Sequence, residues 1–471
     1  MALNLIRCSL SSANLNPLAR YSHHAAHKFS HALQSSPSSD VTVLDNGIKV
    51  ATEKTNSPTA TVGVYVESGS RNEPKELNGI TNFIEHLIFK GSKTRSKVQV
   101  EKDVYGLGAI LNSFNNREHS GFFATLAPND VPKAFELLSE MVTTPGLGEE
   151  NIEEARKDIL RELEECETNH EQIVMDYLHS VAYQETSLGF SKFGTTANVQ
   201  RFTREDLERG FDLIFKGPQM VIAASGNVEH DNIVQMVQKG FSGISSGFDK
   251  NDIPSLPGKR YTGSDIRVRD DSMSCAHIAF AIQGPGYNSP DYLAMEIASS
   301  LFGNWDLTHG GGINTACYMG MVSSSEHLAQ SFQSFNLAYR DTALWGSYVV
   351  GERMKLEELL WQLQYQYKRL CSDVTNNEIR QGKNALLTKL ITQREGSVNN
   401  AHSIASEIFR FGRRLTLEEW QSKISQVNSS NIHQVCEEHI WDRCPAVSAI
   451  GPVENFPNYE EIRMKMSWMR Y

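Results

Sequence analysis

The sequence contains no long apolar run, no paired cysteine spacing and no concentration of basic residues. Nowhere in its 471 residues do apolar side chains approach the roughly 20 in succession that a membrane-spanning helix needs, so we expect no transmembrane segment. The net charge of −11 argues against general nucleic-acid binding, because phosphate recognition draws on concentrated Lys and Arg. The seven cysteines include no Cys-x-x-Cys pair, which favours free thiols in a reducing compartment.

Acidic residues are missing from one segment, residues 1–39, which contains no Asp or Glu. Arg7, Arg20 and Lys28 are set there among Ser, Ala, Leu and His. This composition predicts a mitochondrial transit peptide rather than a secretory signal, which would need a longer apolar core. A disordered tail is the alternative. Cleavage after Tyr21 would suit the local sequence.

The rest of the chain repeats one order of strands and helices. An alternating strand at 59–66 is followed by a helical pattern, and a strand at 276–282 is followed by another. The segments 219–228 and 445–453 end the two halves alike. We therefore expect an internal duplication giving two homologous α+β domains, each a β-sheet with helices packed against it. The expected boundaries are a domain at 40–247, a Pro- and Gly-rich linker at 248–263 and a second domain at 264–471.

One short pattern has chemical meaning, the run Asn82-Phe83-Ile84-Glu85-His86 on the first predicted helix. In the inverted zinc-peptidase pattern H-x-x-E-H, two His side chains four residues apart bind the metal and the Glu acts as general base. Here Glu85 and His86 are present and Asn82 stands where the first His would be. A later acidic helix offers Glu162 as a third ligand. Taken alone, such a pair is more often an ordinary polar helix face.

The surrounding sequence resembles the pitrilysin-type (inverzincin) metallopeptidase family, and within it the mitochondrial branch. The segments that carry the resemblance are distributed along nearly the whole chain after the N-terminal segment. They are 67–71 (ESGSR), 78–92 (NGITNFIEHLIFKGS), 112–118 (NSFNNRE), 304–306 (NWD), 310–312 (GGG), 330–336 (QSFQSFN), 339–342 (YRDT), 411–414 (FGRR) and 466–471 (MSWMRY).

The resemblance implies a role for each motif residue. The family's two His ligands fall on Asn82 and His86, its general base on Glu85 and its distal ligand on Glu162. Active members carry a supporting acidic residue where this sequence has Ala155. An amide oxygen is a weaker zinc ligand than an imidazole, so we expect a vestigial metal site and little or no zinc.

The mitochondrial branch offers two functions. Some members are core subunits of the ubiquinol–cytochrome c reductase complex, which support electron transfer as scaffolds on the matrix side of the inner membrane. Their partners are a related second core subunit and the cytochrome subunits. Others are zinc endopeptidases that cleave presequence peptides with a partner subunit. Because one metal ligand is lost, we expect a non-catalytic or weakly catalytic core subunit without a cofactor. If the chain is instead the endopeptidase, we expect it to bind zinc.

Overall fold

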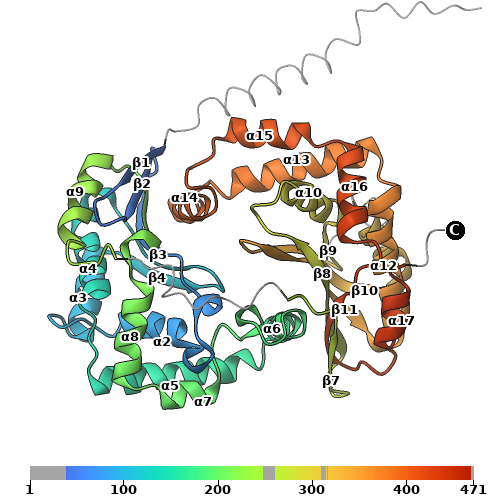
Figure 1. Cartoon of the computed structure of the whole chain (residues 1–471), viewed down its shortest axis with the longest axis horizontal. Coiled ribbons are helices and arrows are strands. Elements are labelled where there is room, and N and C mark those ends of the chain that lie inside the picture. The colour runs from blue at the N-terminus through green and yellow to red at the C-terminus, as the bar shows by residue number, and fades with distance from the viewer. Residues whose placement is uncertain (1–38, 248–259, 309–314, 316, 468–471) are drawn as a thin grey trace, which may run out of the picture.

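Two separate β-sheets organise the computed structural model, which describes residues 39–247, 260–308, 315 and 317–467 (Figure 1). The predicted transit segment, apart from Ser39, lies outside the described residues, as does most of the predicted linker. The glycine run at 310–312 and the last residues, 468–471, also lie outside them. Among the described helices, none combines the length and apolar character that crossing a bilayer requires.

The first sheet has six strands in the described residues, and all neighbouring pairs are antiparallel except β2 with β6. In spatial order they are β1 (Ser39–Val43), β2 (Lys49–Lys54), β6 (Met220–Gly226), β3 (Ala60–Val66), β5 (Ser120–Leu126) and β4 (Ile110–Asn115). Strand β4 is therefore an edge strand.

The second sheet repeats this arrangement. In spatial order its strands are β7 (Asp265–Arg269), β12 (Ala446–Gly451), β8 (Cys275–Pro285), β11 (Thr342–Glu352), β10 (Ala329–Ala338) and β9 (Asn304–Asp306). Strands β7, β12, β8, β11 and β10 match β2, β6, β3, β5 and β4 in chain order, spatial order and direction, including the one parallel pair. The predicted duplication and the α+β class are thus confirmed.

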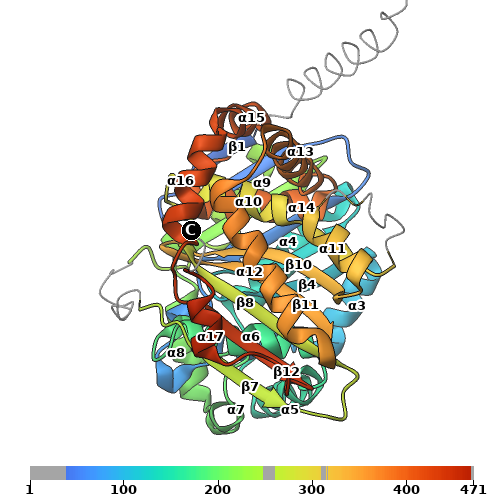
Figure 2. The ribbon, with the colours of Figure 1, turned by 90° about the vertical axis from the view of Figure 1, so that its right-hand side faces the viewer.

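Helices pack against both sheets. The first half contributes α2 (Ile80–Ile88), α3 (Lys97–Leu107), α4 (Val131–Thr143), α5 (Glu149–Cys166), α6 (His170–Ala182), α7 (Thr196–Arg201), α8 (Arg204–Ile214) and α9 (His230–Gly240). The second contributes α10 (Tyr292–Phe302), α11 (Tyr318–Glu326), α12 (Leu356–Ser372), α13 (Asn376–Thr392), α14 (Ser397–Phe411), α15 (Leu417–Gln426), α16 (Ser429–His439) and α17 (Tyr459–Met464). In Figure 2, α10, α12 and α16 lie in front of the second sheet.

The two halves exchange a helix. Helix α6 of the first half packs on β12 and β8 of the second sheet, and α14 of the second half packs on β6 and β3 of the first sheet (Figure 1). Side chains alternate between the faces of a strand. In β3, Val62 and Val64 accordingly join the core under the first half's own helices, whereas Tyr65 contacts the cluster that includes Ile404 of α14.

A buried polar seam accompanies α14 on the first sheet. The amide of Asn400 donates to Glu53 Oε1 at 2.8 Å and to Ser225 Oγ at 2.9 Å. The guanidinium of Arg414 donates to Asn400 Oδ1 at 2.8 Å and pairs with Glu407 at 3.2 Å. Burial lowers the pKa of Arg414, although these carboxylates oppose the shift. Because removing one partner would leave a buried charge uncompensated, the seam fixes where α14 docks.

A second polar junction joins the halves near their loops. Arg71 Nη1 contacts Glu118 at 2.5 Å, and Arg71 Nη2 contacts Asp341 at 2.6 Å. The backbone N–H of Arg340 also donates to Glu118 Oε1 at 3.1 Å. These residues come from three of the sequence segments that carry the family resemblance. These ion pairs and the hydrogen bond thus link the three segments to one another in the folded chain.

The exchanged helix predicts a large stability effect at Ile404, whose side chain is 0% exposed between α14 and the first sheet. Ile404→Ala should lower the free energy of unfolding by about 2–5 kcal/mol, because it leaves a cavity across the junction. Val98→Ala, at a side chain that is 58% exposed, is the control and should change it by less than about 0.5 kcal/mol. Denaturant titration measures both values. Equal effects of the two substitutions would contradict the proposed packing.

Candidate degenerate metal site

The helix that carries the motif, α2, is held at its start by a buried carboxylate. Glu73 accepts hydrogen bonds from the backbone N–H of Gly79 at 2.7 Å and of Thr81 at 2.8 Å. Burial raises the pKa of Glu73, and these hydrogen bonds partly offset the rise. Gly79 has φ +96°, and a side chain there would meet Gly194 Cα at 2.7 Å. Glu73 therefore satisfies donors that the first turn of a helix leaves unpaired.

The apolar residues of α2 decide which way the motif points. Phe83, Ile84 and Leu87 are buried in the core of the first half. The remaining face places Glu85 and His86 at the edge of that core, where each is partly exposed. The buried apolar residues thus anchor α2 in the core. Glu85 and His86, on the remaining face, line a pocket.

Helix α5 brings the predicted distal residue to this face. His86 Nε2 lies 2.9 Å from Glu162 Oε2, with side chains 27% and 35% exposed. Burial alone would raise the pKa of Glu162. The hydrogen bond and charge of His86, with smaller contributions from Asn82 and Lys192, instead hold it below its ordinary value. The imidazole and carboxylate therefore stabilise each other directly.

Asn82 lies beside this pair and is only 3% exposed. It is close enough to Glu162 to help lower the pKa of that carboxyl. Its Nδ2 nevertheless makes no hydrogen bond of normal geometry within the described residues. Leaving a buried donor unpaired costs about 1–3 kcal/mol. At position 82, where the pattern has an imidazole, this chain therefore has a buried amide whose Nδ2 lacks a hydrogen-bond partner within the described residues.

The predicted base, Glu85, has a raised pKa. Burial is the main cause, and a hydrogen bond from Ser113 of β4 and the charge of His86 oppose it. A carboxylate whose pKa is raised is a stronger base than an ordinary glutamate. Sequence reasoning missed Ser113 as a contact of Glu85, because only the fold brings β4 beside α2.

The supporting position predicted at Ala155 lies inside the core. Ala155 is 0% exposed on α5 and packs with Ile159. Ion pairs from residues on either side of Ala155 instead tie α5 to the end of α2. Lys90, just after α2, pairs with Asp158 and lies 3.2 Å from Glu154. Lys90 lies within the segment 78–92, which carries part of the family resemblance, but only the fold brings it beside α5.

A pocket of about 630 Å³ opens beside Glu85, His86 and Glu162. Its wall is formed by α3 and the edge strand β4, which carry the 87% exposed Tyr105 and the 61% exposed Ile110. An apolar rim around a few convergent polar groups is typical of a ligand pocket.

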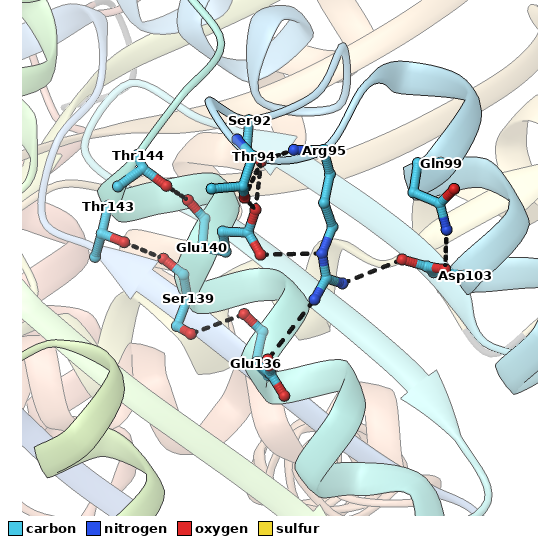
Figure 3. Close-up of polar contacts among 10 residues, drawn as sticks. All are labelled: Ser92, Thr94, Arg95, Gln99, Asp103, Glu136, Ser139, Glu140, Thr143 and Thr144. Atoms are coloured by element: carbon cyan, nitrogen blue, oxygen red, sulfur yellow. Dashed lines mark hydrogen bonds and ion pairs between the residues drawn. The ribbon is translucent and has the colours of Figure 1, made fainter.

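Helix α3 is held in place by the loop that precedes it, as Figure 3 shows. Arg95 Nε lies 3.1 Å from Glu140 Oε2, and its two Nη atoms reach Asp103 at 3.2 Å and Glu136 at 3.7 Å. The hydroxyl of Ser92 also donates to Glu140. One guanidinium therefore ties the wall of the pocket to α4.

Both halves of the chain match family descriptions. Residues 49–196 match "Insulinase (Peptidase family M16)", and residues 201–386 match "Peptidase M16 inactive domain". The chain belongs to the insulinase family of peptidases. The predicted pitrilysin-type relationship is thereby confirmed.

Among family relatives, the mitochondrial cytochrome b-c1 complex subunit 1 of Bos taurus is 39% identical over 94% of this chain and 92% of its own length. The mitochondrial-processing peptidase subunit beta of Homo sapiens is also 39% identical, over 92% of this chain and 88% of its own.

Two solved structures share the fold. A chain from complex III2 of Candida albicans has a TM-score of 0.81 at 24% identity, covering 91% of this chain and 99% of that one. A protease from Helicobacter pylori has a TM-score of 0.77 at 20% identity, covering 88% and 99%.

The three side chains at the family's metal-ligand positions, Asn82, His86 and Glu162, fit zinc poorly. His86 and Glu162 offer one imidazole nitrogen and one carboxylate, which are ordinary zinc ligands. The third member, Asn82, offers only a neutral amide oxygen, which is a weaker zinc ligand than an imidazole nitrogen. The residues are therefore assembled, with one imidazole where the inverted zinc-peptidase pattern has two.

Restoring the missing imidazole tests this interpretation. The purified unmodified chain should hold no tightly bound zinc that depends on His86. Asn82→His should gain about one zinc per chain, because it completes three protein ligands. His86→Ala in the Asn82→His background is the control and should remove that zinc. Metal analysis after dialysis measures all three. Tightly held zinc in the unmodified chain that is lost on His86→Ala would contradict the account.

Proposed function

We propose that this chain is a core subunit of mitochondrial respiratory complex III, of the core protein 1 type. It supports ubiquinol to cytochrome c electron transfer as a matrix-side scaffold peripheral to the inner membrane. The observation that carries the proposal is Asn82, which removes one of three metal ligands from an otherwise assembled site. The similarity to cytochrome b-c1 complex subunit 1 over nearly the whole chain supports the same assignment.

In this role the chain acts through its surfaces. It pairs with a core protein 2-like paralogue and reaches the membrane only through the cytochrome subunits. It carries no haem, quinone or flavin motif, so the redox centres belong to its neighbours. We further propose that the segment 1–39 directs mitochondrial import, with cleavage after Tyr21, and that the chain after it forms domains at 40–247 and 264–471.

A second candidate function is presequence cleavage as a processing-peptidase beta subunit. The retained arrangement of Glu85, His86 and Glu162 beside an open pocket favours it. So does the 39% identity to the human beta subunit. It would require zinc to bind without an imidazole at position 82.

A cleavage assay separates the two candidates. The chain is reconstituted with its alpha-type partner and given a synthetic presequence peptide and zinc. We expect the unmodified pair to cleave at least about 100-fold more slowly than the Asn82→His pair, because loss of even an outer-shell metal partner typically costs about 10–100-fold. Glu85→Gln in the Asn82→His background is the control, since it removes the base and leaves the ligands.

The scaffold assignment predicts background cleavage from the unmodified pair and chelator-sensitive cleavage from the Asn82→His pair. Substantial chelator-sensitive cleavage by the unmodified pair, abolished by Glu85→Gln, would overturn it in favour of the enzyme.

A further inference from the structure

A second set of metal-ligating side chains lies in the second half, where α10 begins and α16 ends. The two helices pack against each other and lie side by side in both views (Figures 1 and 2). Asp291 is the residue before α10, and His439 is the last residue of α16, preceded by Glu438. One ligand atom from each of these three side chains lies within 4.8 Å of the other two. None of the three belongs to the motif on α2.

The spacing of His439 and Asp291 suits a shared cation better than a hydrogen bond. His439 Nε2 lies 3.6 Å from Asp291 Oδ2, whereas hydrogen bonds of this kind span about 2.7–3.2 Å. Two ligands that each lie about 2.0–2.1 Å from one tetrahedral zinc are about 3.3–3.4 Å apart. The observed gap is therefore close to the separation of two ligands of one ion.

The ring nitrogen that faces the carboxylate is itself unsatisfied. His439 Nε2 is inaccessible to solvent and makes no hydrogen bond within the described residues. Buried polar atoms normally have a hydrogen-bond partner or a bound ion. A cation between His439 Nε2 and the neighbouring carboxylates would supply that partner. Asp291 does not use its carboxylate to cap α10, although an Asp in that position commonly does.

The charges also favour a cation. With a neutral imidazole, Asp291 and Glu438 supply two negative charges, which balance a divalent ion. The nearby Arg443 donates to the backbone carbonyl of Glu438 at 2.8 Å. In the described parts of the chain, no Lys or Arg side chain forms an ion pair with the carboxylate of Asp291 or Glu438.

We propose that Asp291, Glu438 and His439 form a divalent-cation site that joins α10 to α16. One imidazole with two carboxylates is a donor set suited to zinc, with water in the fourth position. Bound there, the ion stabilises the helical layer of the second half. This structural role is independent of the proposed function and of the motif on α2.

Zinc titration of the full chain, with its affinity tag removed, tests the site. Calorimetry gives the dissociation constant, and thermal unfolding gives the rise in Tm that a ligand specific for the folded state produces. His86→Ala is introduced throughout, so that the motif on α2 contributes nothing. In this background we expect binding of one zinc and a Tm that rises with zinc concentration. His439→Gln should weaken binding by at least about 10-fold and abolish the rise in Tm.

His433→Gln, the same substitution on the same helix, is the matched control and should keep the binding of the His86→Ala chain. Glu438→Gln, at an exposed side chain, provides a second disabling variant should His439→Gln fail to fold. No zinc-dependent rise in Tm in the His86→Ala chain would overturn the proposal. So would a rise that survives both His439→Gln and Glu438→Gln.

Discussion

The structure depends on burying both faces of each sheet, and the chain achieves this only by exchanging helices between its halves. The helices of each half cover one face of their own sheet, and α6 or α14 from the other half covers the second face. Strands β3 and β6 are consequently buried along their whole length. Neither half would have a complete core alone, so the two α+β units form one body. The site on α2 is held in place because the apolar face of α2 packs into that core.

Much of this architecture could be read from the sequence, and the reason is periodicity. The strands at 59–66 and 276–282 and the matching ends at 219–228 and 445–453 correspond to β3, β8, β6 and β12, which hold equivalent places in the two sheets. The helix exchange could not be predicted, because an amphipathic pattern shows that a face is buried without showing what buries it.

The candidate site was predictable to a similar degree. The helix fixes the spacing of Asn82, Glu85 and His86, and the later acidic helix together with the family resemblance indicates Glu162. The structure brings all four residues together. The capping role of Glu73, the hydrogen bond from Ser113 and the ion pairs of Lys90 could not be predicted, because each depends on tertiary contacts. A site can thus retain its shape after losing a ligand, since its helices are fixed by the core and by ion pairs. Retained geometry at Glu85 and His86 is therefore compatible with a scaffold.

As a core subunit, the chain would work as a structural part of a membrane complex. The most direct test of this role is purification of the tagged chain from detergent-solubilised mitochondrial inner membranes, with haem spectra and mass spectrometry of what accompanies it. If the chain is a core subunit, b- and c-type cytochromes and a second core subunit should be recovered in equal proportion to it. Recovery of the chain instead as a soluble matrix heterodimer, without cytochromes, would contradict this role.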